Sequence, residues 1–181
     1  MRTALSFDDV LLVPKHSDIM SREEIKISQQ LTKVRHEGFT LPIIASPMDT
    51  ISEVTMSRSV SDCGGVAIIH RYNSIQEQAK MVMDVINTGH TVGAAIGVGD
   101  DFVERAKALV QVGVSLLCID VAHGHHTKVR YALKVLRNTF GDDIHIMAGN
   151  VATLEAFNDL ADWGADSIRV GIGGGSICST R

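Results

Sequence analysis

Apolar and polar stretches alternate on a long, regular period from residue 41 to the end of the chain. Short apolar runs are separated by amphipathic stretches of helical length, which is the pattern of repeated β/α units. The runs that predict strands are Leu41–Ser46, Gly65–Ile69, Val92–Gly97, Leu116–Asp120, Ile144–Gly149 and Ile168–Gly171. The stretches that predict helices are Glu53–Asp62, Ile75–Asn87, Phe102–Val112, Lys128–Phe140 and Leu154–Trp163.

The ends of these predicted helices carry local signals of their own. Short polar residues that can accept a hydrogen bond from a first-turn N–H precede four of them: Ser52, Ser74, Asp101 and Thr153. Glycines that can adopt a left-handed conformation follow four of them: Gly64, Gly89, Gly113 and Gly164.

The predicted strands are continuously apolar, which indicates parallel strands that are covered on both faces. Alternating β and α units then leave two architectures, an open doubly wound sheet or a closed (β/α)₈ barrel, and periodicity does not separate them. Residues 1–40 lack the pattern, and we expect an N-terminal arm that covers one end of the core formed by residues 41–181. A whole barrel usually needs about 200 residues or more, so an incomplete one of about six strands is expected.

Composition narrows the class of protein. The net charge is −4 and the pI about 6.0, so nothing indicates a nucleic-acid or anionic-membrane partner. The sequence has no apolar run of the roughly 18 residues that a membrane span needs. Its three cysteines form no CxxC pair, which favours a reducing, cytoplasmic setting over a disulfide framework or a zinc site. Cys63 and Cys118 are expected in the core.

Polar residues collect directly after the predicted strands, where a (β/α)₈ barrel holds its reactive groups. Asp120 ends one strand, and it could accept a hydrogen bond from a ligand hydroxyl or help to cap a helix. Asn150 follows the next strand. Arg169 lies inside the last one, where a buried arginine requires a partner or a ligand.

The last loop has four glycines among residues 171–175, which would let backbone groups converge on an ion; the alternative is a flexible tail. Cys178 follows as a candidate nucleophile, although a lone cysteine is more often inert. His123, His125 and His126 invite a metal interpretation. No HExxH spacing accompanies them, so a polar loop and helix start is favoured.

Five blocks of the chain, in order, resemble the IMP dehydrogenase/GMP reductase family. They are Leu5-Ser-Phe-Asp-Asp-Val-Leu-Leu-Val-Pro14, Ala45-Ser-Pro-Met-Asp-Thr50, Asp120-Val-Ala-His-Gly124, Ala148-Gly-Asn-Val-Ala-Thr153 and Val170-Gly-Ile-Gly-Gly-Gly-Ser-Ile-Cys-Ser-Thr-Arg181. The resemblance covers nearly the whole chain. It implies a (β/α)₈ TIM barrel, an oxidoreductase of purine biosynthesis and a homo-tetramer.

The resemblance also implies roles for individual residues. Cys178 matches the nucleophile that adds to purine C2, and Thr180 the residue that assists the water or ammonia step. The substrate nucleotide monophosphate would contact Ser46, Met48 and Ser176. The nicotinamide riboside of NAD, or of NADP, would contact Asp120, Asn150, Arg169 and Gly171. Backbone carbonyls of Gly173, Gly175 and Cys178 would bind K⁺.

Two reactions fit the resemblance. The segment Ser46-Pro47-Met48 looks like a dehydrogenase, which converts IMP to XMP with NAD⁺, and this reaction is favoured. The segment Asp120-Val121-Ala122 looks like a reductase, which converts GMP to IMP and ammonia with NADPH. The short connection before Val92 leaves no room for a regulatory CBS insertion. A third reading, from another class, is a catalytically silent fragment that needs a complementing C-terminal chain.

Overall fold

The computed structural model describes residue 5, residues 9–28 and residues 39–173. Within them, six parallel strands form one sheet in the order β1-β2-β3-β4-β5-β6. The strands are β1 (Ile44–Ala45), β2 (Val66–Ile69), β3 (Val92–Ile96), β4 (Leu116–Asp120), β5 (His145–Val151) and β6 (Ser167–Val170). Each strand overlaps one of the predicted runs. β1 is shorter than predicted, and Pro42 in that run has no N–H to donate to a ladder.

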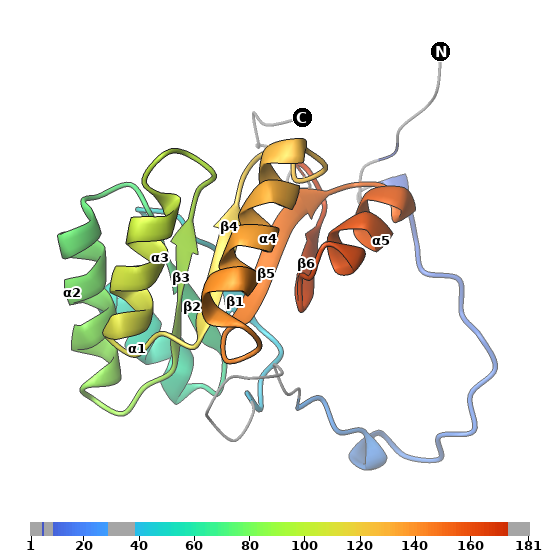
Figure 1. Cartoon of the computed structure of the whole chain (residues 1–181). Helices are drawn as coiled ribbons and strands as arrows, with labels where there is room; N and C mark the ends of the chain where they lie inside the picture. The colour runs from blue at the N-terminus through green and yellow to red at the C-terminus, as the bar shows by residue number, and fades with distance from the viewer. Residues whose placement is uncertain (1–4, 6–8, 29–38, 174–181) are drawn as a thin grey trace.

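The helices alternate with the strands and lie on the outer face of the sheet (Figure 1). They are α1 (Val54–Asp62), α2 (Ile75–Ile86), α3 (Phe102–Gln111), α4 (Thr127–Phe140) and α5 (Leu154–Asp162), with a short 3₁₀ turn η2 (Arg22–Glu24) in the N-terminal arm. All five predicted helices are therefore confirmed within a few residues.

Two of the four predicted caps are formed as expected. The Ser74 hydroxyl accepts from the Glu77 N–H in a capping box, and the Thr153 hydroxyl accepts from the Ala156 N–H. The prediction for Ser52 is wrong, because the N-cap of α1 is the next residue and the Ser52 hydroxyl donates to the Ser46 carbonyl instead. Asp101 precedes α3 but makes no side-chain cap, since its carboxylate pairs with Arg105. The four glycines after helices all have positive φ, as predicted.

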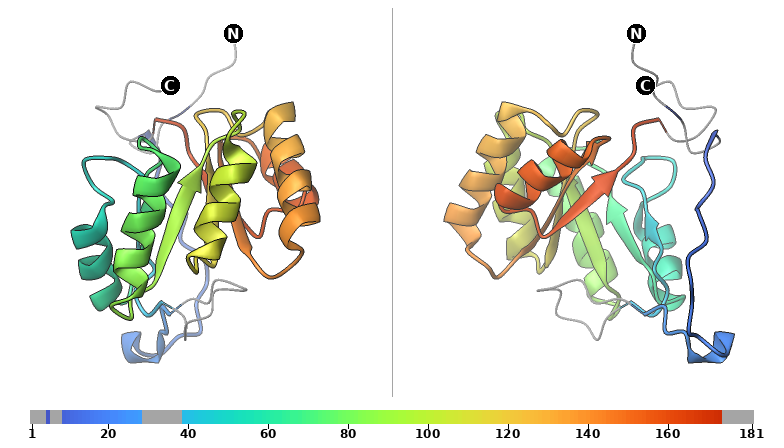
Figure 2. Two further views of the ribbon diagram at one scale, coloured as in Figure 1. Left: turned by 60° about the vertical axis from the view of Figure 1, so that its left-hand side comes forward. Right: turned by 90° about the vertical axis from the view of Figure 1, so that its right-hand side faces the viewer.

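Sheet order decides between the two architectures that the sequence left open. A doubly wound sheet reverses its strand order at a switch point, whereas here every strand pairs with its neighbours in sequence. The sheet curls as a half-barrel with the helices outside, as the two turned views of Figure 2 show. The fold is thus an α/β half-barrel, consistent with an incomplete TIM barrel.

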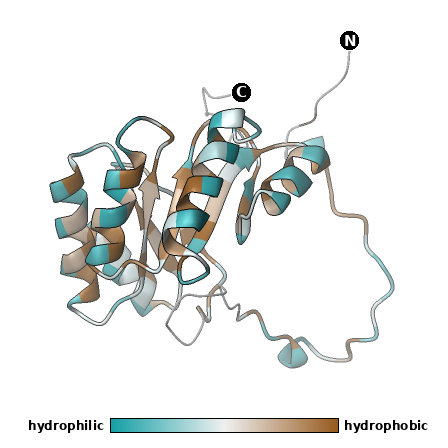
Figure 3. Ribbon diagram, viewed as in Figure 1, coloured by the Kyte–Doolittle hydropathy of each residue, from teal (hydrophilic) through white to brown (hydrophobic). Residues whose placement is uncertain are grey.

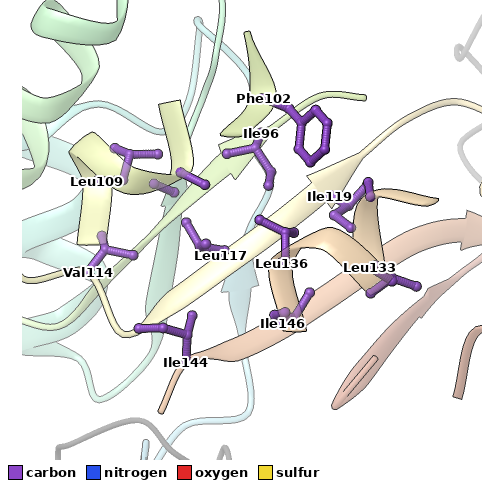
Figure 4. Close-up of a cluster of buried hydrophobic side chains, with 14 of the residues drawn as sticks. Ile96, Phe102, Leu109, Val114, Leu117, Ile119, Leu133, Leu136, Ile144 and Ile146 are labelled. Atoms are coloured by element: carbon purple, nitrogen blue, oxygen red, sulfur yellow. The ribbon is translucent and has the colours of Figure 1, made fainter. Parts of the chain in front are cut away.

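Residues of β2, β3, β4 and β5 pack into two different cores, one on each face of the sheet. The outer core joins the sheet to its helices and includes Leu117, Ile119 and Ile146, which pack with Leu133 and Leu136 (Figure 4). The inner core fills the concave side with Val66, Ile68, Ala95, Leu116, Cys118 and Met147. Hydrophobic colours dominate along β3 to β5, while the helices carry both kinds of residue (Figure 3). Strands covered on both faces explain the continuous apolar runs.

The two cysteines that were assigned to the core differ. Cys118 is fully buried, as predicted, and burial raises the pKa of its thiol to about 12. The prediction for Cys63 is wrong: it is exposed, because it is the C-cap residue of α1 rather than part of an apolar face.

Residues 9–28 run as an extended, exposed segment outside the barrel wall (Figure 1). The division into an arm over residues 1–40 and a barrel over 41–181 stays a prediction. No helix among the described residues is long and apolar enough to cross a membrane.

Candidate functional site

A cleft of about 400 Å³ opens at the carboxyl end of the sheet. Its described lining comes from the ends of five strands, β1, β2, β4, β5 and β6, and from the loops that follow them: Ser46, Pro47, Met48, Arg71, Tyr72, Asp120, Val121, Ala122, Asn150, Arg169, Ile172 and Gly173. Six of these residues were proposed as site residues from the sequence: Ser46, Met48, Asp120, Asn150, Arg169 and Gly173. The fold therefore brings together positions that are up to about 130 residues apart in the chain, because parallel strands end at one edge.

An ion pair lies in this cleft. Arg169 Nη1 donates to Asp120 Oδ1 at 2.5 Å, and both side chains are less than a quarter exposed. Burial lowers the pKa of Arg169, but its contacts with Cys118 and Asp120 outweigh burial and raise that pKa above its ordinary value. The arginine inside an apolar strand thus has the partner that its burial requires.

Asn150 is held by hydrogen bonds on both sides. Its side-chain amide donates to the Gly171 carbonyl at 2.8 Å, and its backbone N–H donates to the Val121 carbonyl at 2.8 Å. The Asn150 carbonyl accepts from the Gly124 N–H at 2.6 Å, and a Cβ on Gly124 would lie only 2.8 Å from that oxygen. Glycine at position 124 is therefore required for the two loops to meet.

Gly171 does not line the cleft. Its carbonyl accepts the hydrogen bond from the Asn150 side chain and so helps to position that residue. At the base of the loops, a Cβ on Gly149 would lie 2.7 Å from the Arg169 Cβ. Glycine at position 149 therefore lets β5 and β6 approach closely beneath the ion pair.

Hydrogen bonds from Ser52 hold the turn that follows β1. The buried Ser52 hydroxyl donates to the Ser46 carbonyl at 2.5 Å, and the Ser52 N–H donates to the Met48 carbonyl at 2.8 Å. Pro47 is buried, whereas Met48 is 47 % exposed. This arrangement presents the Met48 side chain at the cleft on a backbone that cannot easily shift.

Arg71 and Tyr72 are cleft residues for which no role was predicted from the sequence. The Arg71 guanidinium lies 5.5 Å from the centre of the Tyr72 ring, and its Nη2 donates to the Asp120 carbonyl at 3.3 Å. The signal was present: a charged and an aromatic residue come right after a wholly buried strand, at the rim where functional residues gather.

The histidines after β4 are used locally. His126 is the N-cap of α4, where Nδ1 accepts from the Lys128 N–H at 3.0 Å. His125 Nε2 lies 2.8 Å from Asp159 Oδ2, and its ring stacks on Trp163. The interpretation as a polar loop and helix start is confirmed. Among the described residues, no group of three or more His, Cys, Asp or Glu side chains could hold a metal ion.

Several predicted residues lie outside the described part of the chain: Ser176, Gly175, Cys178 and Thr180. Of the three carbonyls proposed for K⁺, only that of Gly173 belongs to a described residue, so the potassium site stays a prediction. Within the described residues, Cys118 is the thiol nearest the ion pair, and Arg169 Nη1 lies 3.8 Å from its sulfur. With a pKa of about 12 it remains protonated at neutral pH and is no nucleophile.

The cleft can therefore bind a polar, hydroxyl-bearing ligand through a carboxylate, an amide and two guanidinium groups, while an attacking group must come from elsewhere. Comparisons with known proteins agree with this picture. A profile for the IMP dehydrogenase / GMP reductase domain matches residues 4–181.

The similar proteins include both IMP dehydrogenases and GMP reductases. Inosine-5'-monophosphate dehydrogenase of Cryptosporidium parvum is 34% identical over 98% of this chain and 53% of its own length. The corresponding enzyme of Borreliella burgdorferi is 33% identical over 99% of this chain and 56% of its own length. GMP reductase of Vibrio vulnificus is 32% identical over 98% of this chain and 52% of its own length. The chain spans about half the length of these relatives, and it belongs to the IMP dehydrogenase/GMP reductase family.

Proposed function

We propose that this chain is part of an IMP dehydrogenase-like enzyme, which converts IMP, NAD⁺ and water to XMP and NADH. One observation carries the proposal: four separated blocks that resemble the family meet in a single cleft. Ser46 and Met48 come from the block over residues 45–50, Asp120 from that over 120–124, Asn150 from that over 148–153, and Gly173 from that over 170–181. A chain that shared only ancestry with the family, and not its function, would not need these polar residues to line one cleft.

In the proposed reaction, Cys178 supplies the nucleophile. Its thiolate forms a bond to C2 of the purine, and the hydrogen on C2 leaves as hydride. NAD⁺, when bound, accepts that hydride. Water then adds to C2 with help from Thr180 and loses a proton to solvent, the carbon–sulfur bond breaks, and the thiolate is released with XMP. Division into two steps lowers the barrier that a direct displacement would meet.

The cleft residues fit a nicotinamide riboside by their chemistry. Asp120 offers a carboxylate that accepts from ribose hydroxyls, and Asn150 offers an amide beside it. Arg169 fixes the orientation of the Asp120 carboxylate. We propose NAD rather than NADP, Ser176 as a contact for the substrate phosphate, and K⁺ at the carbonyls of the loop over residues 173–178.

A second candidate is GMP reductase, and a specific observation favours it. Alignments with GMP reductases run over 182 to 186 residues, close to the 181 of this chain. Alignments with three dehydrogenases run over 220, 230 and 304 residues, which indicates extra segments in those proteins. In this chain α2 and β3 are separated by only five residues, 87–91.

The assembly is also a proposal. The chain spans about half of its relatives' length, and we propose that catalysis needs the remaining part of the barrel. We propose a cytoplasmic protein whose partners are further copies in a homo-tetramer or a complementing C-terminal chain. The residues 1–181 alone would then bind ligands and turn over slowly or not at all.

Absorbance of the reduced nicotinamide tests these alternatives. Purified chain with K⁺ is offered IMP with NAD⁺ and, separately, GMP with NADPH, each with Cys178→Ser as control. Turnover with IMP that the control lacks supports the dehydrogenase, and turnover with GMP supports the reductase. Turnover of neither pair, even after addition of the C-terminal half of a relative, would contradict both.

A further inference from the structure

The cleft carries a net positive charge in an acidic protein. Its described lining contains two arginines, Arg71 and Arg169, and one carboxylate, Asp120. The carboxylate is bonded to Arg169, so the charge of Arg71 is left over. The whole chain has a net charge of −4, so this excess is local and does not follow from composition.

Arg71 has few partners inside the protein. Apart from the bond of Nη2 to the Asp120 carbonyl and the contact with the Tyr72 ring, no ion pair joins it to a described residue. Its Nε is buried and, within the described chain, has no hydrogen-bond partner. A guanidinium has five N–H donors, and one that loses water without gaining acceptors is destabilising. Acceptor oxygens of a ligand would supply what the protein does not.

Two other arginines of the barrel wall have more hydrogen-bond acceptors than Arg71 has. Arg105 bonds to Gln78, Asn73 and Asp101, and Arg137 bonds to Asp166 and three backbone carbonyls. Arg58 resembles Arg71, with one bond to a carbonyl and a buried, unbonded Nε, but it does not line the cleft. Poor bonding and a place in the cleft occur together only at Arg71 among the arginines just compared.

The surroundings hold Arg71 in position. A Cβ on Gly97 would lie 3.3 Å from Arg71 Nη1, so glycine admits the guanidinium against the end of β3. The buried His70 accepts from the Tyr72 N–H at 3.2 Å, and its Nε2 lies 3.2 Å from Glu53 Oε1. The segment that carries Arg71 is therefore fixed before any ligand arrives, which reduces the entropy lost on binding.

We propose that Arg71 binds a phosphate oxyanion of a nucleotide held in the cleft, an inference that rests on the proposed function. Guanidinium and phosphate match in charge and in the geometry of paired hydrogen bonds. The phosphate has two possible sources, the purine nucleotide monophosphate or the diphosphate of the dinucleotide cofactor. Their chemistry at Arg71 is the same, and the experiment separates them.

The test is calorimetric titration of the full chain with IMP, inosine, NAD⁺ and inorganic phosphate. Arg71→Gln is expected to weaken binding of the contacted phosphate compound about ten- to hundred-fold, without change for inosine. Loss confined to IMP identifies the substrate phosphate, and loss confined to NAD⁺ identifies the cofactor. Arg58→Gln, the matched control, should leave all four affinities as in the wild type.

Two milder variants guard against misfolding of Arg71→Gln. Arg71→Lys keeps the charge and should lose less affinity, and Gly97→Ala should displace the guanidinium slightly and cost a few-fold. If the Arg71 variants bind IMP, NAD⁺ and phosphate as tightly as the wild type does, the inference is overturned. It is also overturned if Arg71→Gln weakens the binding of inosine as much as that of IMP. Binding of inorganic phosphate that Arg71→Gln loses, without binding of IMP or NAD⁺, would overturn the nucleotide as the ligand of Arg71 and contradict the proposed function. No binding of any probe by the wild type overturns both.

Discussion

Two arginines flank the same pair of strands, and they differ in how completely the protein surrounds them. Arg105, on α3, lies among the helices outside β2 and β3. It bonds to Gln78, whose amide in turn donates to the Ile69 and Ala95 carbonyls of those strands. Arg71 follows β2 on the cleft side, and its side chain makes a single hydrogen bond to the described residues.

The difference separates structural from functional charge. Arg105 is 8 % exposed and its donors are matched by protein acceptors, so the network ties α2 and α3 to the sheet and leaves nothing for a ligand. Arg71 is half-buried with donors left over, at the rim where barrels bind ligands. In the sequence Arg71 stands between a histidine and a tyrosine and Arg105 between a glutamate and an alanine, and these neighbours do not show how completely each guanidinium is bonded.

The largest effect on stability is expected for Arg105→Met. The substitution removes the donors that satisfy the buried Gln78 side chain and the Asn73 carbonyl, and it should lower the free energy of unfolding by about 2–4 kcal/mol. Urea denaturation followed by circular dichroism measures this loss.

Measurement of nucleotide affinity separates the roles of Arg105 and Arg71. The folded fraction of Arg105→Met should bind nucleotides as the wild type does, whereas Arg71→Gln should show the reverse pattern, with stability kept and affinity lost. Equal losses of stability in the two variants would remove the distinction drawn between them.

A smaller, pH-dependent effect is expected in the inner core, at Cys118 beside Arg169. The folded-state pKa of Cys118 is about 12, raised by burial from 9.0, so the folded protein keeps a proton that the unfolded chain releases. The stability this gives is fully present below about pH 9 and is lost as the pH rises toward 12.

Cys118→Ala should therefore cost about 1–2 kcal/mol near neutral pH and less as the medium becomes alkaline. Urea unfolding of both proteins from pH 8 to pH 11 gives the difference. A gap that stays constant over this range would contradict the raised pKa. Cys63, which is exposed, should react with a thiol reagent at pH 8 while Cys118 does not.

The smallest effect is expected at the start of α2, one turn before Gln78. Ser74→Ala removes the hydroxyl that accepts from the Glu77 N–H and should cost about 1 kcal/mol. Ser74→Thr, which keeps a hydroxyl, is the control. A cost as large as that of Arg105→Met would mean that the Arg105 network depends on the first turn of α2 rather than on its own hydrogen bonds.

Local chemistry in the sequence determined the elements of this protein. Continuous apolar runs predicted the buried strands, and glycines after helices predicted the left-handed residues, because both depend on a few neighbouring residues. The polar residues after strands predicted much of the cleft, since parallel strands must end together. Ser52 and Cys63 were misjudged because a serine can cap a helix or bond to another segment, and a cysteine can lie in a core or at a helix end.

Only the tertiary structure decided the rest. The order of strands, which makes a barrel wall instead of a doubly wound sheet, depends on pairings between segments 20 or more residues apart. The pairing of Asp120 with Arg169 follows from those strand pairings in turn, and it leaves Arg71 without an ion-pair partner among the described residues. Charge in a sequence is a property of each residue, whereas compensation of charge depends on distance, and distance exists only once the chain has folded.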